Sequence, residues 1–298
     1  MTRTIGLLAM DHIAAGLVEE NRLVGSKLVF PDRQSEYDTL GAMHAGEIVA
    51  GLARQVQAAA DGGEVGAVGV GFPGMIRAGV VEDSPNLKQM KGQNLGEQLA
   101  AQLREKGINA PVFVVNDADA IAAGLAATSG QLDNFIRVWA VGTGIGFGRY
   151  PRAEGAWENG HQVVTLDPKE TYCQCGGVGH VEGIMGYRAM RRRFLDLEPE
   201  EVFAHAREGD RRCAEFVELW HRALAAATAN SVHADGPGKF FVSGPNAKYV
   251  QTNMLDLYLH EMVKMSPLQG SSFEIVPTSD ETAIIGAAVS AARSAAVQ

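Results

Sequence analysis

A cysteine- and histidine-rich stretch between residues 158 and 182 constrains this chain more than any other part of its sequence. Cys173 and Cys175 form a C-x-C pair, His180 follows five residues after Cys175, and His161 lies twelve residues before Cys173. Thiolates and imidazole nitrogens are ligands of tetrahedral zinc, and four of them close a structural site. The alternative is two buried cysteines and two surface histidines in a flexible loop, but this cluster in a chain with three cysteines would be a rare coincidence. The stretch therefore predicts structural zinc.

The motifs of this stretch resemble the zinc loop of the ROK (repressor, open reading frame, kinase) family of sugar kinases and sugar-responsive repressors. The family pattern is E-x-G-H followed by C-x-C-G-x-x-G-C-x-E. The residues that match it here are Glu158, Gly160, His161, Cys173, Cys175, Gly176, Gly179 and Glu182. His180 stands in the place of the last cysteine, which keeps four ligands and removes one negative charge. The resemblance implies that Glu158, His161 and Glu182 contact sugar hydroxyls, with zinc orienting them rather than acting as a catalyst.

A polar pair stands between a buried strand and a helix. The strand, residues 111–115, runs into Asn116 and Asp117, and the helix is expected at 121–127. Open α/β folds bind ligands at this position, but asparagine and aspartate are also preferred helix caps, and the residues alone favour capping. N-D-A-x-A at such a strand end resembles the ROK catalytic motif, which implies Asp117 as general base for a sugar hydroxyl and Asn116 as a sugar ligand. Asp119 occupies a variable place in the motif and is expected to be solvated.

A proline–glycine turn follows another short apolar strand. The strand, residues 67–71, leads into Phe72-Pro73-Gly74, and Ser84-Pro85-Asn86 follows further along. Proline–glycine pairs mark turns of many kinds, so the pair alone is weak evidence. The spacing resembles that of the ROK family, in which the backbone of this turn passes the sugar. Gly74 and Asn86 are therefore expected at the sugar, because an amide both donates hydrogen bonds to hydroxyls and accepts them.

A glycine-rich segment, residues 142–148, follows the apolar strand predicted at 135–141. Its G-x-G-x-G-x-G pattern is a weak signal alone and also fits a hairpin, since residues 148–150 continue as a strand. After such a strand it resembles the second phosphate turn of the ROK family, and the two interpretations are compatible. The resemblance implies that Thr143 hydrogen-bonds a transferring phosphoryl group and that small residues such as Gly144 leave room for it.

The first turn of the chain departs from the family. Residues 4–10 and 12–19 are predicted strands joined by a tight turn at Met10 and Asp11. ROK kinases carry D-x-G-G-T here, which wraps the ATP phosphates, whereas this chain has neither the glycines nor the threonine. Met10 and His12 would crowd such a cradle, because side chains block the approach of phosphate to the backbone. Asp11 is a candidate Mg²⁺ ligand, although aspartate in a turn more often serves the turn itself.

The resemblance spans nearly the whole chain and implies two α/β lobes around a cleft, the actin/Hsp70/hexokinase-like (ribonuclease H-like) fold. Residues 1–117 are expected to form the first lobe together with a C-terminal helix at about 283–298. Residues 118–282 are expected to form the second lobe, which carries the zinc loop. Hydrophobic patterning places further strands at 22–30 and 239–243, and helices at 47–60, 95–106, 184–194, 199–206, 212–232 and 246–263.

Charge and cysteine usage limit the partners and the compartment. The formal net charge of −9 argues against nucleic acid or an anionic membrane as the main partner. No apolar run approaches transmembrane length, and the N-terminus lacks the features of a signal peptide. Cys213 lies outside the predicted zinc site and is expected to be a buried, inert thiol. A chain with two cysteines in a metal site and one such thiol predicts a reducing, cytoplasmic compartment. No DNA-binding extension precedes the first strand, which disfavours the repressor branch of the family.

Two classes of function stay open. The first is a hexose kinase that moves a phosphoryl group from Mg²⁺-bound ATP or another polyphosphate donor to a sugar hydroxyl, with C6 as the expected position. The second is a sugar-binding protein or non-kinase enzyme on the ROK scaffold with a degenerate ATP site. Damaged donor-side motifs favour the second, whereas the presence of both Asp117 and Thr143 favours the first. The resemblance implies the kinase, acting on a small-molecule sugar as a homodimer, because the family is commonly dimeric.

Overall fold

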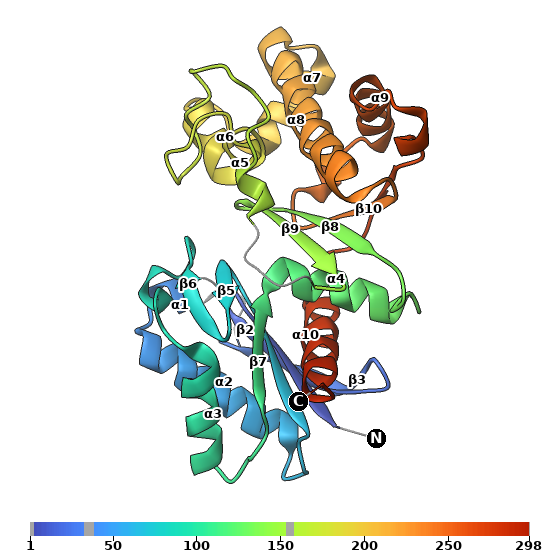
Figure 1. Ribbon diagram of the computed structural model, residues 1–298. Coiled ribbons are helices and arrows are strands. Elements are labelled where there is room, and N and C mark those ends of the chain that lie inside the picture. Colours follow the sequence, from blue (N-terminus) through green and yellow to red (C-terminus); the bar gives the residue numbers. More distant parts are fainter. Residues whose placement is uncertain (1–2, 33–38, 153–157, 298) are drawn as a thin grey trace. The chain divides into compact units, whose positions relative to one another are not determined.

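The computed structural model describes residues 3–32, 39–152 and 158–297 of the chain (Figure 1). Contacts divide the chain into two compact units. The first consists of Met1–Ile136, Gly148–Trp157 and Ser279–Gln298, and the second of Arg137–Phe147 and Glu158–Thr278. The chain therefore enters the second unit twice before its last helix returns to the first.

The first unit is built on a five-stranded sheet with the order β3-β2-β1-β4-β7. Its strands are β1 (Thr4–Ala9), β2 (Ile13–Glu19), β3 (Arg22–Phe30), β4 (Ala67–Phe72) and β7 (Val112–Asn116). β1 pairs antiparallel with β2 and parallel with β4, which pairs parallel with β7. Every residue of β1 and β4 is buried, as expected for central strands covered on both faces. The smaller elements are α1 (Thr39–Ala42), the hairpin of β5 (Met75–Arg77) and β6 (Val80–Asp83), and the 3-10 helix η2 (Lys88–Met90).

Helices cover both faces of this sheet. They are α2 (Ala45–Ala60) and α3 (Leu95–Glu105) on one face, and α4 (Asp117–Thr128) and α10 (Asp280–Ala295) on the other (Figure 1). Ile5 and Leu7 of β1 belong to the hydrophobic cluster that contains the buried residues of α2 and α3, whereas Leu8 belongs to the cluster of α4 and α10. Successive side chains of a strand point to opposite faces, so β1 supplies both clusters.

α10 approaches α4 so closely that only glycine fits at two contact positions. A side chain at Gly124 of α4 would collide with the backbone of Thr282, and one at Gly286 of α10 would collide with the backbone of Ala120. The two glycines let the helix backbones touch. α4 is grouped with the first unit through this contact, although the sequence analysis placed it at the start of the second lobe.

The second unit contains a four-stranded sheet with the order β11-β10-β8-β9. Its strands are β8 (Ile136–Val141), β9 (Ile145–Tyr150), β10 (Lys239–Ser243) and β11 (Ser272–Ile275). Its helices are α5 (Val181–Met185), α6 (Tyr187–Arg193), α7 (Pro199–Glu208), α8 (Arg211–Asp235) and α9 (Thr252–Met262), with the 3-10 helices η3 (Asn159–His161), η4 (Ala247–Tyr249) and η5 (Ser266–Leu268). β10 pairs parallel with both β8 and β11.

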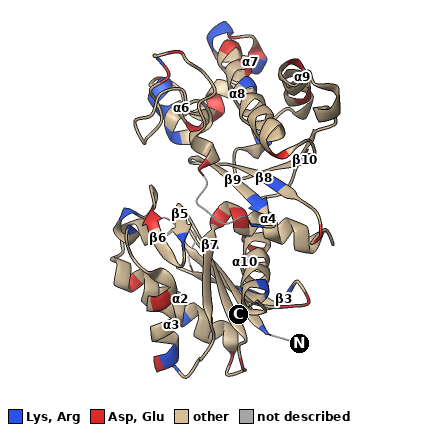
Figure 2. Ribbon diagram, in the orientation of Figure 1, with Lys and Arg blue, Asp and Glu red and all other residues tan. Residues whose placement is uncertain are grey.

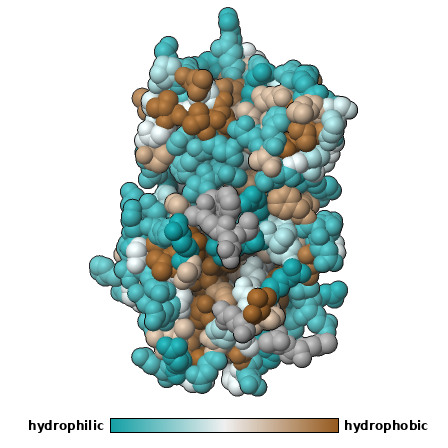
Figure 3. All heavy atoms as spheres, viewed as in Figure 1, coloured by the Kyte–Doolittle hydropathy of each residue, from teal (hydrophilic) through white to brown (hydrophobic). Residues whose placement is uncertain are grey.

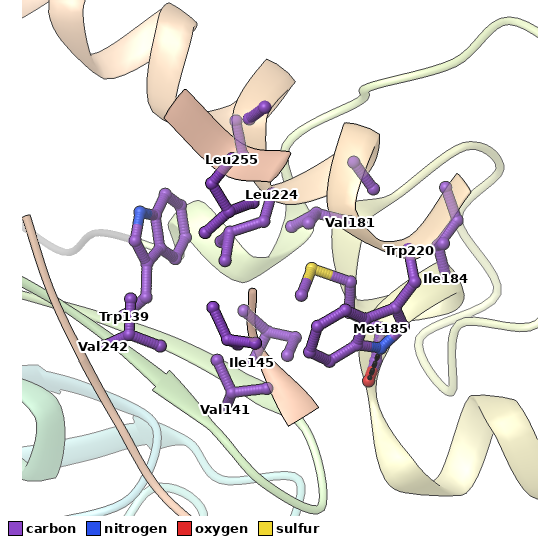
Figure 4. Packing of buried hydrophobic residues seen from close by; sticks show 14 of the residues in the cluster. Trp139, Val141, Ile145, Val181, Ile184, Met185, Trp220, Leu224, Val242 and Leu255 are labelled. Atoms are coloured by element: carbon purple, nitrogen blue, oxygen red, sulfur yellow. Dashed lines mark hydrogen bonds between the residues drawn. The ribbon is translucent and has the colours of Figure 1, made fainter. Parts of the chain in front are cut away.

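Two tryptophans anchor the core of the second unit, which Figure 4 shows from close by. Trp139 of β8 and Trp220 of α8 are fully buried, and the Trp220 indole N–H donates to the Met185 carbonyl over 3.1 Å. Met185 belongs to α5, whose apolar side chains point into the same core, so the core fixes the helix that begins directly after His180. Cys213 also lies in this core, and burial raises its pKa to about 11, which confirms the predicted buried thiol.

Three predicted helices differ from the observed ones by more than three residues or are divided. The helix predicted at 184–194 is split into α5 and α6, because Gly186 is extended, with φ −63° and ψ 140°, and separates them. The helix predicted at 121–127 begins at Asp117, where the preceding asparagine caps it. The helix predicted at 246–263 forms over its second part only, as α9, and η4 occupies its beginning.

Hydrophilic residues cover much of the face that Figure 3 shows, with hydrophobic residues between them. The most exposed large apolar side chains include Leu166 and Leu195, each 90% exposed and both outside regular helices and strands. No helix among the described residues is both long and apolar enough to cross a membrane.

α10 begins at an acidic residue that is paired with basic side chains near the start of the chain. Asp280 Oδ2 accepts a 2.6 Å hydrogen bond from Lys27 Nζ of β3 and lies 3.2 Å from His12 Nε2 in the turn after β1. These partners, His12 first, hold the pKa of Asp280 at about 2, although burial alone would raise it. A carboxylate in the first turn of a helix also interacts favourably with the helix dipole. The ionised Asp280 therefore ties the first turn, β3 and α10 together.

Replacing Asp280 by asparagine is expected to destabilise the protein at pH 7 by about 1–2 kcal/mol, because its pKa of about 2 lies well below the ordinary 3.8. The stability that comes from a lowered carboxyl pKa is complete above pH 3.8 and is lost as the pH falls towards 2. Urea unfolding at pH 7 and at pH 3 measures how far the free energy of unfolding of the variant lies below that of the parent. This difference is expected to be smaller at pH 3. Glu64→Gln, at an exposed position, is the control. Parent-like stability of Asp280→Asn at pH 7 would contradict this role.

Candidate functional site

Four metal-ligating side chains converge in the second unit: His161, Cys173, Cys175 and His180, whose ligand atoms all lie within 4.8 Å of one another. His161 Nδ1 lies 3.3 Å from His180 Nδ1 and 3.5 Å from Cys173 Sγ. Cys175 Sγ lies 3.3 Å from both Cys173 Sγ and His180 Nδ1. A zinc tetrahedron with bonds of about 2.0–2.3 Å separates its ligand atoms by about 3.3–3.8 Å. These four residues, the metal group, therefore match structural zinc in donor type, and the four distances given above lie in the range of a zinc tetrahedron.

Short-range backbone contacts bring the metal group together. His161 closes η3, and His180 directly precedes α5. The Gly176 N–H donates to the Cys173 carbonyl over 3.1 Å, and Gly176 has φ +85°, a conformation that glycine adopts without steric cost. The chain can therefore double back from Cys175 to His180 within a few residues.

Two carboxylates border the metal group. His161 turns Nδ1 toward the other ligands and Nε2 toward Glu158 Oε2, which is 4.0 Å away. Cys173 Sγ lies 3.6 Å from Glu182 Oε1. Carboxylates beside metal ligands orient those ligands and set their protonation. The two glutamates expected at the sugar thus lie beside the residues expected to bind zinc.

The surroundings shift the protonation of two members of the group. Burial raises the pKa of the Cys173 thiol to about 12, while burial and the neighbouring His161 lower the pKa of His180. Neutral imidazole is the metal-binding form of histidine, and a cation stabilises the thiolate that ligates it. Metal binding by this group is therefore expected to release protons.

Glu182 also holds the glycine-rich turn between β8 and β9. Its Oε2 accepts a 3.0 Å hydrogen bond from the Ile145 N–H, and a side chain at Gly144 would overlap the same carboxylate. The first N–H groups of α6 donate to carbonyls of the turn, including that of Gly142 over 3.1 Å. Thr143, within the turn, is exposed, and its contact with a phosphoryl group stays a prediction. The turn, Glu182 and the metal group are thus connected by direct contacts.

In the first unit, Asn116 connects the end of β7 to two neighbouring segments. Its Oδ1 accepts a 2.9 Å hydrogen bond from the Ala118 N–H and so caps α4, as the capping alternative predicts. Its Nδ2 donates to the Gly74 carbonyl over 2.9 Å. Gly74 has φ +107°, and a side chain there would collide with the backbone of Asp83. Asn116 therefore fixes the proline–glycine turn, and its contact with a sugar stays a prediction.

Asp117 opens α4 at the carboxyl end of β7. Part of the residue reaches solvent, but desolvation of its carboxyl by the surrounding protein raises its pKa to about 6 against the opposing backbone hydrogen bonds. The nearby charge of Asp119 raises it further. Figure 2 shows acidic residues in red at the start of α4. A carboxylate that is ionised at neutral pH yet more basic than usual is suited to general-base catalysis.

The prediction that Asp119 is solvated is wrong. Asp119 is 8% exposed, and its Oδ1 accepts a 2.9 Å hydrogen bond from the Arg149 N–H. Its Oδ2 lies 3.9 Å from Arg152 Nε. Burial raises the pKa of Asp119, and the two arginines oppose this effect. Because α4 begins earlier than predicted, Asp119 lies in its first turn and faces the end of β9 rather than water.

Asn86, the remaining predicted sugar contact, lies on an exposed turn after β6. Ser84 is buried, and its Oγ accepts a 3.2 Å hydrogen bond from the Leu87 N–H, which fixes this turn. The predicted site residues thus fall into two sets. Those of the first unit are Gly74, Asn86, Asn116 and Asp117, and those of the second are Thr143, Gly144, Glu158, His161, Glu182 and the rest of the metal group.

The first turn is closed rather than open to a phosphate. The Met10 N–H donates to the His12 carbonyl over 3.0 Å, so this backbone donor is used within the turn. The His12 side chain lies against Asp280, which adds a carboxylate where a phosphate cradle would need positive charge. Asp11, the candidate Mg²⁺ ligand, is exposed, and its carbonyl accepts from the Leu40 N–H over 3.5 Å. These contacts stabilise the fold, and the loss of the phosphate cradle at this turn stays a prediction.

Two groups of charged residues were not predicted from the sequence. Asp280 and Lys27 are 253 residues apart in the chain, so no local pattern relates them. Glu170 and Arg193 form an ion pair beside the metal group, with side chains only 10% and 16% exposed. A local signal for the second pair was present: an acidic residue three positions before Cys173 and a run of arginines that ends α6.

The chain matches the profile of the ROK family over residues 11–293. It is 31% identical over 246 residues to a glucokinase of Pyrobaculum calidifontis, and the match covers 76% of this chain and 79% of the relative. It is 26% identical over 307 residues to a glucokinase of Thermotoga maritima, with 92% of each protein covered.

Solved structures share the fold. A ROK hexokinase from Thermus thermophilus matches with a TM-score of 0.79 at 25% identity, and 100% of each chain is covered. A ROK family glucokinase from Streptomyces griseus, in complex with glucose and AMPPNP, matches with a TM-score of 0.70 at 23% identity over 98% of this chain and 99% of that one. These likenesses confirm the predicted actin/Hsp70/hexokinase-like fold class.

Elemental analysis of the purified protein is expected to find about one zinc per chain, because four donors of these types can close a tetrahedral zinc site. Cys175→Ala removes one ligand and is expected to lose the zinc. It is also expected to lose most of the sugar affinity, since Glu158 and Glu182 lie beside the metal group. Cys213→Ala, outside the group, is the control and is expected to keep both. Full sugar affinity in zinc-free protein would sink the orienting role.

Proposed function

Since this chain belongs to the ROK family, we propose that it is a hexose kinase that transfers a phosphoryl group to a sugar hydroxyl, with C6 as the acceptor position. Asp117 carries the proposal. It stands between the end of β7 and the first turn of α4, where open α/β folds bind ligands, and its pKa is raised to about 6. The relatives named glucokinase support a hexose as the acceptor.

In this mechanism Asp117 accepts the proton of the attacking sugar hydroxyl. The hydroxyl oxygen forms a bond to phosphorus while the bond from phosphorus to the bridging oxygen of the donor breaks, and that electron pair leaves with the donor. A general base is most effective when its pKa lies near the working pH. With a pKa of about 6, Asp117 is ionised at neutral pH and still more basic than an ordinary aspartate.

The sugar is held by carboxylate and amide side chains. Glu158 and Glu182 accept hydrogen bonds from hydroxyls, while Asn86 and Asn116 both donate and accept them. Glu182 Oε2 has a backbone partner at 3.0 Å, but carboxylate oxygens carry further lone pairs that a hydroxyl can use. Zinc in the metal group would orient these two glutamates, because His161 lies beside Glu158 and Cys173 lies beside Glu182.

The donor phosphates are received by the glycine-rich turn of the second unit. Thr143 presents an exposed hydroxyl, and the absence of a side chain at Gly144 leaves room for the Glu182 carboxylate that supports the turn. The donor is ATP or another polyphosphate. When bound, Mg²⁺ neutralises charge on the phosphates.

A second candidate is a sugar-binding protein or non-kinase enzyme on the same scaffold. The closed first turn favours it, because the Met10 N–H is bonded within the turn and Asp280 lies against His12. Both candidates use the same sugar-side residues. They differ in whether a phosphoryl donor binds at all.

The compartment and the assembly belong to the same proposal. None of Cys173, Cys175 and Cys213 forms a disulfide, which fits a reducing cytoplasm. The net charge of −9 speaks against nucleic acid as a partner. The family resemblance supports a homodimer, which light scattering on a sizing column would detect.

Asp117→Asn is expected to lower turnover by about 10²–10⁴-fold while leaving most of the sugar affinity, because it removes the base and keeps the shape. In the parent, the rate is expected to fall as the pH drops through about 6, since protonated Asp117 cannot accept a proton. Initial rates over a pH series and a sugar titration provide the measurements.

Asp119→Asn is the matched control, because it removes the other acidic charge in the first turn of α4 and keeps an acceptor for the Arg149 N–H. Its turnover is expected to stay within a few-fold of the parent. Parent-like turnover of Asp117→Asn would reduce Asp117 to a helix residue without a catalytic role.

Titration calorimetry is expected to detect weak MgATP binding, or none, beside ordinary sugar binding. The closed turn lacks several phosphate contacts of about 1.5–3 kcal/mol each, and three of them correspond to about three orders of magnitude or more in affinity. The titration is made with MgATP and with an inorganic polyphosphate, each with and without sugar. Micromolar MgATP affinity would show that this turn has rebuilt a phosphate site. No binding by either donor would overturn the kinase in favour of the second candidate.

A further inference from the structure

The ion pair of Glu170 and Arg193 has no part in the proposed reaction. Glu170 is 8% exposed as a whole, and the Arg193 side chain is 16% exposed. Arg193 Nη1 donates to Glu170 Oε1 over 3.0 Å, and Nη2 donates to Oε2, so the pair is bidentate. Removing one partner of such a pair leaves an uncompensated buried charge, which is strongly unfavourable. The pair therefore holds the segment that carries Glu170 against α6.

This segment leads directly into the metal group. The Glu170 carbonyl accepts a 2.8 Å hydrogen bond from the Gly179 N–H, and Gly179 directly precedes the second ligand histidine. The Arg193 guanidinium lies 4.2 Å from the centre of the Tyr172 ring, and Tyr172 directly precedes the first ligand cysteine. One partly buried arginine thus contacts the chain beside two of the four ligands.

Other arginines of α6 reach the same loop from the surface. Arg188 Nη1 donates to Gln174 Oε1 over 3.0 Å, and Arg192 Nη1 donates to the Tyr172 carbonyl over 3.4 Å. Figure 2 shows basic residues of this helix in blue. Both of these side chains belong to exposed residues, and exposed polar contacts contribute little. Arg193 differs from them because its guanidinium is largely removed from water.

We propose that Arg193 is a positioning residue for the metal group and acts through Glu170 and Tyr172. The inference rests on the proposed zinc binding and names the residue that prepares the ligands for it. Without Arg193, the Glu170 carboxylate would turn toward water and would draw its segment away from Gly179. Ligands that are already ordered lose less conformational freedom when the metal binds, so the zinc affinity depends on the ion pair.

The zinc affinity of Arg193→Met tests the proposal, measured on metal-free protein by competition with a chromophoric chelator. Loss of an outer partner of metal ligands typically lowers the affinity about 10–100-fold, and a loss of this size is expected. Arg193→Lys keeps the charge but not the bidentate fork and is expected to lose less. Arg191→Met on the same helix is the matched control, because Arg191 and its partner Glu198 have side chains 47% and 49% exposed. Its zinc affinity is expected to equal that of the parent.

Urea unfolding of the metal-free variants separates positioning from stability. If Arg193→Met is less stable but binds zinc as tightly as the parent, the ion pair is merely structural and the inference is overturned. If Arg193→Met does not fold, Arg193→Lys decides, since parent-like zinc affinity in that variant overturns the inference and weaker affinity supports it. A parent protein without zinc affinity would sink the metal proposal itself and this inference with it.

Discussion

The rest of the second-unit site depends on the two contacts that the Glu182 carboxylate makes. One oxygen receives the Ile145 N–H of the glycine-rich turn, and the other faces the thiol of Cys173. Its helix, α5, is held in turn by the buried core, where Trp220 bonds the Met185 carbonyl. A displacement of this one side chain would therefore disturb the turn and the metal group together. The proposed sugar, metal and donor contacts of the second unit therefore share one support.

The sequence predicted the features that are local in the chain and missed those that are not. His161 and the cysteines lie within twenty residues of His180, so their spacing alone indicates a shared site. Asn116 and Asp117 were located because a strand end followed by a polar pair is a local pattern, and only the family resemblance distinguishes catalysis from capping. Asp119 was misjudged because the start of α4 was predicted too late, and helix boundaries decide which side chains face inward.

Partners that come from distant segments could not be predicted from pattern. The ion pair of Asp280 and Lys27 joins the last helix to β3, and nothing in the sequence around either residue indicates the other. The close contact of Gly124 and Gly286 likewise depends on how two helices meet in space. The fold class was nevertheless predictable, because the cysteine–histidine loop and the strand-end motifs resemble those of the ROK family, whose solved members share this fold.

The return of α10 to the first unit bears on the order in which the protein can be completed during synthesis. β1 leaves the ribosome first, but the helix that covers one of its faces follows only after Thr278, when the whole second unit has been made. Nascent chains usually fold their N-terminal domains first. Here the second unit lies between Arg137 and Thr278 and can form its own core before α10 is made. Until then, the apolar side chains of β1 that pack on α10 remain exposed on that face. The first unit is therefore completed after the second, and the face of β1 that packs on α10 stays uncovered until then.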